Sequence, residues 1–104
     1  MDELETDLRS KLNSETAKIG WSELERHFAR GVVVAVAPEL DLVEVAFAMA
    51  NDDKTALNGW LQSQQVTRAS EEQALDWVAR QPTFWAVVVA PWVVIQEARP
   101  QPDA

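Results

Sequence analysis

The chain has no cysteine, three glycines and a single histidine among its 104 residues. The lack of cysteine excludes disulfides, a thiolate nucleophile and cysteine-ligated zinc, and it fits a reducing compartment. Gly20, Gly31 and Gly59 stand too far apart to form a phosphate-binding loop or a dinucleotide-binding fingerprint. Any Ser-His-Asp site would have to use His27, and neither a nucleophile elbow nor an HExxH motif is present. The common enzyme classes therefore leave no trace, and we expect no cofactor.

Long apolar segments are also absent. The longest apolar stretch, residues 84–95, has twelve residues, whereas a helix that spans a bilayer needs about 20. The first residues are acidic and lack the apolar centre of a secretory signal. We therefore expect a soluble, cytoplasmic protein that does not bind membranes.

Positive charge is scarce, with nine Lys and Arg residues against seventeen Asp and Glu residues, which gives a net charge of −8. Such a surface repels the phosphates of nucleic acids and the headgroups of anionic lipids, so we expect no nucleic-acid partner. The carboxylates are spread along the chain, which favours a solvated acidic surface. Mimicry of nucleic acid by carboxylates gathered on one face is a weaker alternative.

What the sequence does contain is typical of one globular domain. Its residues are 47% hydrophobic and 25% charged, and its length fits a single folding unit. We expect one domain over residues 1–97, followed by a disordered tail over residues 98–104 that contains Pro100 and Pro102.

Five helices are predicted from apolar residues spaced three or four apart and from capping residues. They cover residues 2–18, 21–30, 41–50, 53–64 and 70–81. The spacing of a capping box occurs at three helix starts, namely Asp2 with Glu5, Asp41 with Glu44, and Ser70 with Gln73.

Residues 32–37 and 84–97 are rich in valine and apolar at successive positions, which indicates strands buried on both faces. Pro91 interrupts the second segment, and Pro-Trp is poor chemistry for a tight hairpin turn. We therefore prefer one bent strand there, with a hairpin as the alternative. The predicted fold class is α+β, with about five helices packed on a small two- to three-stranded sheet.

A sheet of so few strands, apolar on both faces, is only marginally stable alone, and its edges invite pairing with another chain. We therefore expect a homodimer that extends or covers the sheet. The alternative is that the helices of one chain cover it.

The predicted helix over residues 21–30 carries a candidate partner-binding surface. Arg26, His27 and Arg30 lie on its polar face, and the two arginines, one turn apart, could clamp a carboxylate or a phosphate. Trp92 follows Pro91 at an irregular point of the second strand segment, and tryptophan is a common interface anchor. These four residues are interpreted as a surface for an unidentified protein partner.

The acidic residues around the predicted third helix are a candidate metal site. Asp41 and Glu44 could hold Mg²⁺ or Mn²⁺, which prefer oxygen ligands, although helix capping explains both residues as well. We therefore favour a non-catalytic protein-interaction or regulatory domain. The alternative is a divalent-metal-dependent hydrolase or a small-ligand binder that uses these acidic residues.

Four segments, taken in order, resemble a family of short bacterial proteins known only as a domain of unknown function. They are residues 21–31 (WSELERHFARG), 40–46 (LDLVEVA), 51–53 (NDD) and 85–93 (WAVVVAPWV). The resemblance extends over roughly residues 4–97 and implies a bacterial, cytosolic, single-domain protein. It implies no activity and no functional residues.

Overall fold

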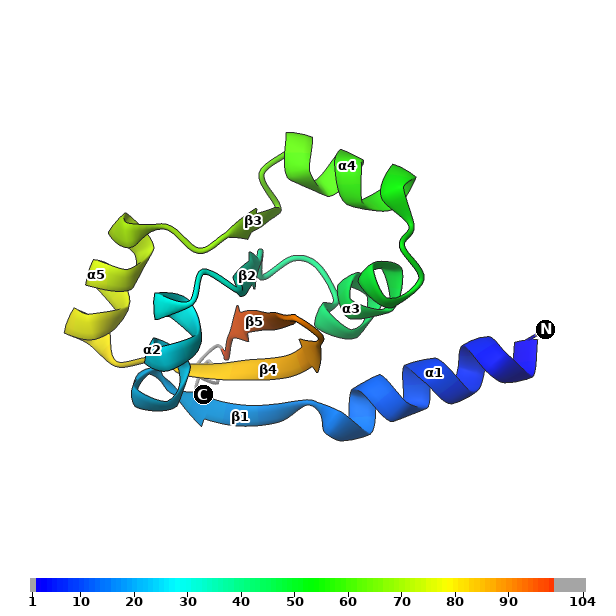
Figure 1. Ribbon diagram of the computed structural model, residues 1–104, viewed down its shortest axis with the longest axis horizontal. Coiled ribbons are helices and arrows are strands. Elements are labelled where there is room, and N and C mark those ends of the chain that lie inside the picture. Colours follow the sequence, from blue (N-terminus) through cyan, green and yellow to red (C-terminus); the bar gives the residue numbers. More distant parts are fainter. Residues whose placement is uncertain (1, 99–104) are drawn as a thin grey trace, which may run out of the picture.

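A five-stranded mixed sheet forms the centre of the computed structural model, which describes residues 2–98. The helices are α1 (Asp2–Glu15), α2 (Trp21–Ala29), α3 (Leu42–Ala50), α4 (Lys54–Gln62) and α5 (Glu71–Arg80). The strands are β1 (Ala17–Gly20), β2 (Val33–Val36), β3 (Val66–Arg68), β4 (Thr83–Val89) and β5 (Trp92–Glu97). They lie in the order β1-β4-β5-β2-β3 (Figure 1), with β2 and β5 parallel and the other neighbours antiparallel. The predicted α+β class with five helices is confirmed.

Each face of the sheet is covered by helices of the same chain. On one face Val34, Val87 and Val94 pack in a core with α1 and α3, and Trp60 of α4 lies against it. On the other face Phe84 and Ile95 pack in a second core with α2 and α5. Burial on both faces explains why the strand segments are apolar at successive positions. Both faces of the sheet are therefore covered without a second subunit. The homodimer stays a prediction, but an uncovered sheet face no longer supports it.

The two edge strands, β1 and β3, add to the two or three strands expected from the sequence. β1 has four residues and begins at Ala17, inside the segment expected to be helical, because α1 ends earlier, at Glu15. β3 has three residues, too few for a periodic pattern. Pairing with the longer strand β4 and with β2 holds these two segments in the sheet.

β4 and β5 form an antiparallel hairpin, so the preferred interpretation of one bent strand is wrong and the alternative is confirmed. Val89 pairs with Trp92, which leaves Ala90 and Pro91 as a two-residue turn. The Ala90–Pro91 peptide bond is cis. A turn of type VI carries cis-proline at its third position and needs no glycine, so the residue preferences of ordinary two-residue hairpin turns do not apply to it.

The helix ends follow their capping residues. The predicted box of Ser70 and Gln73 is formed with both of its hydrogen bonds, and the Asp41 side chain accepts a hydrogen bond from the Val43 N–H. Asp53 caps α4 in the same way. The predicted box of Asp2 and Glu5 lies outside the described side chains. Of the predicted tail over 98–104 only Ala98 is described, and its N–H donates to the Thr83 carbonyl oxygen.

An exposed ion-pair network ties α5 to β5. Arg80 Nη2 lies 2.6 Å from Asp76 Oδ2 and 2.8 Å from Glu97 Oε2, and Trp77 Nε1–H donates to Glu97 Oε2 over 3.3 Å. Hydrogen bonds from Arg80, together with its charge, lower the pKa of both carboxyl groups. The network holds the indole of Trp77, which is 4% exposed, against the end of the sheet.

Glycine is required at position 31 but not at position 59, which gives a matched pair of substitutions. Gly31 has φ +74°, and a Cβ there would lie 3.2 Å from Arg68 Nη2. Gly59 lies within α4, where a Cβ would meet nothing within 4 Å. We expect Gly31→Ala to lower the free energy of unfolding by about 1–2 kcal/mol. We expect Gly59→Ala to raise it by about 0.5–1 kcal/mol. Urea unfolding measures both changes, and equal midpoints for the two variants would contradict this account.

The network around Arg80 makes stability depend on acid pH. Because the folded state lowers the pKa of Glu97, the ion pair stabilises above the unfolded pKa and is lost as pH falls through the folded one. Since the pair is exposed, we expect Glu97→Gln to lower the free energy of unfolding by about 0.5 kcal/mol at neutral pH. The difference from wild type should shrink below about pH 4.3, the ordinary pKa of glutamate. Urea titrations at several pH values test this, with the exposed Glu25→Gln as control; a difference that is independent of pH argues against the ion pair.

Candidate functional site

The three predicted partner-binding residues of α2 lie together near its C-terminal end. Arg26 and Arg30 are exposed and His27 is half-buried. Among the side chains that the structure describes, those of residues 7–98, neither arginine has an ion-pair or hydrogen-bond partner. Two guanidinium groups, one turn apart, are therefore open to solvent on an otherwise acidic protein.

Trp92, the fourth predicted residue, lies at the same end of the sheet but contacts a different arginine. Trp92 is half-buried at the start of β5, and the guanidinium carbon of Arg68 lies 5.7 Å from its ring centroid. Arg68 Nη2 also donates a hydrogen bond of 2.8 Å to the carbonyl oxygen of Gly31, the residue that follows Arg30. Arg68 thus joins β3, β5 and the end of α2. No sequence pattern assigns Arg68 to this surface, because Gly31 and Trp92, which it contacts, lie far from it along the chain.

The two candidate metal ligands have other partners in the fold. Asp41 caps α3, as described above, and Glu44 forms a bidentate ion pair with Arg9 of α1. The two contacts are 3.0 Å from Arg9 Nη2 to Oε1 and 2.9 Å from Nε to Oε2. The same guanidinium lies 4.1 Å from the ring centroid of Phe47. A metal at Glu44 would have to displace Arg9, which fastens α1 to α3.

No group of three or more histidine, aspartate and glutamate side chains in the described part of the chain is placed to hold a metal ion. Asp41 lines an open hollow of about 480 Å³, together with Glu39, Trp85 and Gln96. The metal site at Asp41 and Glu44 therefore stays a prediction.

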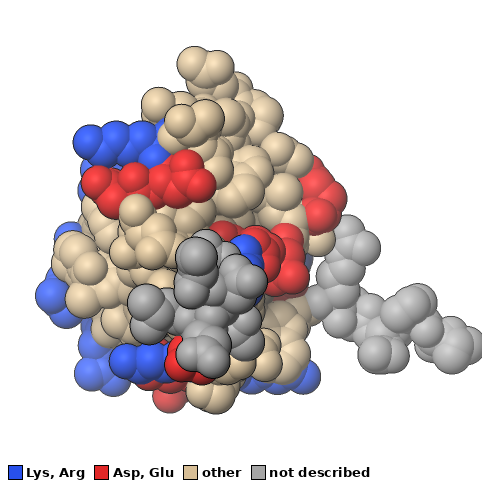
Figure 2. All heavy atoms as spheres, turned by 90° about the vertical axis from the view of Figure 1, so that its right-hand side faces the viewer, with Lys and Arg blue, Asp and Glu red and all other residues tan. Residues whose placement is uncertain are grey.

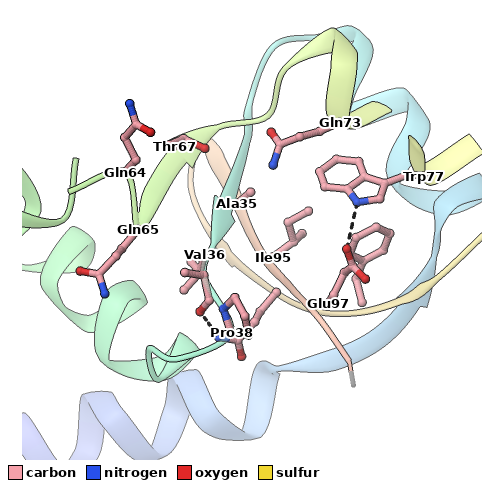
Figure 3. A pocket seen from close by; sticks show the side chains of 13 residues that line it. Ala35, Val36, Pro38, Gln64, Gln65, Thr67, Gln73, Trp77, Ile95 and Glu97 are labelled. Atoms are coloured by element: carbon pink, nitrogen blue, oxygen red, sulfur yellow. Dashed lines mark hydrogen bonds between the residues drawn. The ribbon is translucent and has the colours of Figure 1, made fainter. Parts of the chain in front are cut away.

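A cavity of about 280 Å³ opens at the carboxyl ends of the parallel strands β2 and β5. Figure 3 shows Gln73 and Trp77 of α5 on one side of it, Gln64 and Gln65 on the other, and the strands between them. Glu97 is its one lining residue with an ionisable side chain, and this carboxylate is paired with Arg80. Sequence patterns did not indicate this cavity, because its walls come from segments far apart in the chain.

Charges of both signs alternate on the face of the molecule shown in Figure 2, and neither sign forms a continuous patch there. The described residues visible on that face therefore show no gathering of carboxylates of the kind that mimicry of nucleic acid requires. Within the described residues, no helix is long and apolar enough to cross a bilayer.

Comparisons with known proteins show a family but no activity. The NMR solution structure of PA1075 from Pseudomonas aeruginosa resembles this fold with a TM-score of 0.81 and 48% sequence identity, over 94% of this chain and 91% of that one. No curated protein matches the chain. Residues 7–97 match the family model described as "Protein of unknown function (DUF2288)". The resemblance seen in the sequence is thereby confirmed, and the chain belongs to the DUF2288 family.

Proposed function

We propose that the protein is a cytoplasmic, non-catalytic interaction domain that binds an acidic segment of a protein partner through the end of α2. The observation that carries this proposal is the contrast among its arginines. Arg9, Arg68 and Arg80 are each engaged within the fold. Arg26 and Arg30 have no such partner in the described residues and are exposed.

The chemistry of the guanidinium group supports an acidic partner. Arginine presents a planar fork of donors that matches a carboxylate with two parallel hydrogen bonds. Arg26 and Arg30 are one turn apart, so successive carboxylates of a partner could each be bound. The half-buried Trp92 packs against the core that α1 and α3 cover, on the other face of the sheet from α2, and Arg68 links its ring to the Gly31 carbonyl oxygen at the end of α2. Arginine and tryptophan are both enriched among the residues that dominate binding energy at interfaces.

A plainer explanation must be separated from this one. Basic side chains in the last turn of a helix stabilise it through the helix dipole, by about 0.3–1 kcal/mol each. Arg26 lies in the last turn of α2 and Arg30 caps it, so both could serve folding alone. The test must therefore measure binding and stability separately.

We expect Arg26→Glu/Arg30→Glu to lose a partner that wild type retains in a pull-down from native lysate. The matched control is Lys11→Glu/Lys54→Glu, which changes the net charge equally at two other exposed cations without described partners. Circular dichroism with thermal unfolding checks the fold of each variant. The proposal requires a near-stoichiometric partner that the lysine control keeps, that the arginine variant loses at least tenfold, and that a glutamate-rich peptide displaces. Equal retention by both variants, or equal loss, contradicts it.

The homodimer expected from the sequence is a separate part of the proposal. Leu75 is 72% exposed and Val78 is 50% exposed, and they lie three residues apart on the outer side of α5. Sedimentation equilibrium should then give about twice the monomer mass, and Leu75→Glu/Val78→Glu should halve it. Leu61→Glu, at a 49% exposed position on α4, is the control. If wild type is monomeric at high concentration, the homodimer is contradicted, whereas the proposal for the arginine surface is not affected.

A further inference from the structure

The cavity at the carboxyl ends of β2 and β5 exists because a small residue stands at the centre of its floor. Ala35 is half-buried and pairs with Thr67 on one side and with Ile95 on the other. A larger side chain here would fill the space between α5 and β3. The resulting hollow of about 280 Å³ has room for a molecule of roughly nine water volumes.

Two polar groups at the cavity, the Gln73 side-chain amide nitrogen and the Thr67 hydroxyl, have no described hydrogen-bond partner. Gln73 Oε1 accepts a hydrogen bond from the Ser70 N–H over 3.0 Å, which fixes the orientation of the side-chain amide. Its Nε2 group forms no hydrogen bond within the described residues, and Figure 3 shows the side chain reaching from α5 over the strands. The Thr67 hydroxyl on β3, likewise without a described partner, lines the same cavity.

The remaining walls favour an uncharged occupant. Ala35, Ile95 and the fully buried Phe84 supply apolar surface. Glu97 is already neutralised by Arg80 and holds the indole N–H of Trp77. A free charge would meet no counter-charge here, and burying it would be unfavourable. A carbonyl oxygen, by contrast, can accept from Gln73, and an amide N–H can donate to the Thr67 hydroxyl.

We propose that this cavity binds a small uncharged molecule that carries a carboxamide-type group. The carbonyl oxygen accepts from Gln73 Nε2, the amide nitrogen donates to Thr67, and the apolar body lies over Ala35 and Ile95. The cavity is smaller than pockets for drug-sized ligands, so the occupant has on the order of ten non-hydrogen atoms. This site lies apart from the arginines of α2, and the proposal does not rest on the interaction function.

Nicotinamide is a suitable probe, and nicotinate, its carboxylate counterpart, is the charge control. Both are titrated into the full ¹⁵N-labelled chain, and ¹H–¹⁵N spectra report on the indole N–H of Trp77, the side-chain amide of Gln73 and the backbone of Ala35. We expect saturable shifts centred on these residues with nicotinamide and much weaker ones with nicotinate. The absence of saturable nicotinamide shifts up to its solubility limit, or equal shifts with both probes, overturns the proposal.

Two variants locate the binding. Gln73→Glu keeps an oxygen for the Ser70 N–H, so the cap of α5 is preserved while the donor to the ligand is lost. We expect it to weaken nicotinamide binding about fivefold or more. Ala35→Ile fills the cavity floor with a residue that favours strands and should abolish the shifts. Ala17→Ile, the same change at an exposed strand position outside the cavity, should leave them intact. Shifts that survive both Gln73→Glu and Ala35→Ile would show binding elsewhere and would falsify this assignment.

Discussion

The parallel pairing of β2 with β5 joins the early and late parts of the chain, and the positions of both proposed sites depend on it. Val33, Val34 and Ala35 lie beside Val93, Val94 and Ile95, and the Val93 N–H donates to the Val32 carbonyl oxygen. Parallel strands cannot be joined by a tight turn, so a long connection, residues 37–91, runs between them and supplies β3 and β4 to the same sheet. At the starting end of this pair stand Gly31, Arg68 and Trp92; at its finishing end lies the amide-lined cavity.

Because the chain is short, all five of its helices are used to cover the two faces of the sheet. α1, α3 and α4 are taken by one face, and α2 and α5 by the other. On the second face Trp21, Trp77 and Phe84 form a chain of ring contacts with centroids 5.9 Å and 5.1 Å apart. The indole N–H of Trp77 meets a carboxylate at the edge of this cluster, so the large aromatic core has no unpaired donor there. The arginine surface accordingly lies at the end of α2, and the cavity lies in the gap between α5 and β3.

Local patterns predicted the parts of this fold that local physics determines. The helices followed from apolar spacing and from caps such as Ser70 with Gln73, and the exposure of Arg26 and Arg30 followed from helical periodicity. β1 and β3 were missed because strands this short have no pattern of their own and depend on pairing. The hairpin was missed because its turn uses a cis-proline, which residue preferences for ordinary hairpins do not include.

Contacts between distant segments could not be predicted in the same way. Arg9 and Glu44 are 35 positions apart, and Arg68 is 37 positions from Gly31, so no spacing rule connects them. Glu44 has capping-box spacing with Asp41, yet in the fold its carboxylate binds Arg9 instead. The cavity draws on five separate segments, and only the folded chain places Ala35 between Gln73 and Thr67.

The net charge of −8 and the two open arginines are compatible because they act over different distances. At physiological ionic strength the Debye length is about 8 Å, so the overall repulsion of an acidic partner is largely screened beyond one or two side-chain lengths. A bidentate contact between guanidinium and carboxylate acts at about 2.8 Å, where salt screens it less and geometry decides its strength. The engaged arginines show how the same group behaves inside the fold, where Arg9 and Arg80 each bind carboxylates of another element. Arg26 and Arg30 present that same chemistry outward, so the net acidity of the protein does not contradict the proposed binding of a carboxylate-bearing partner at this one place.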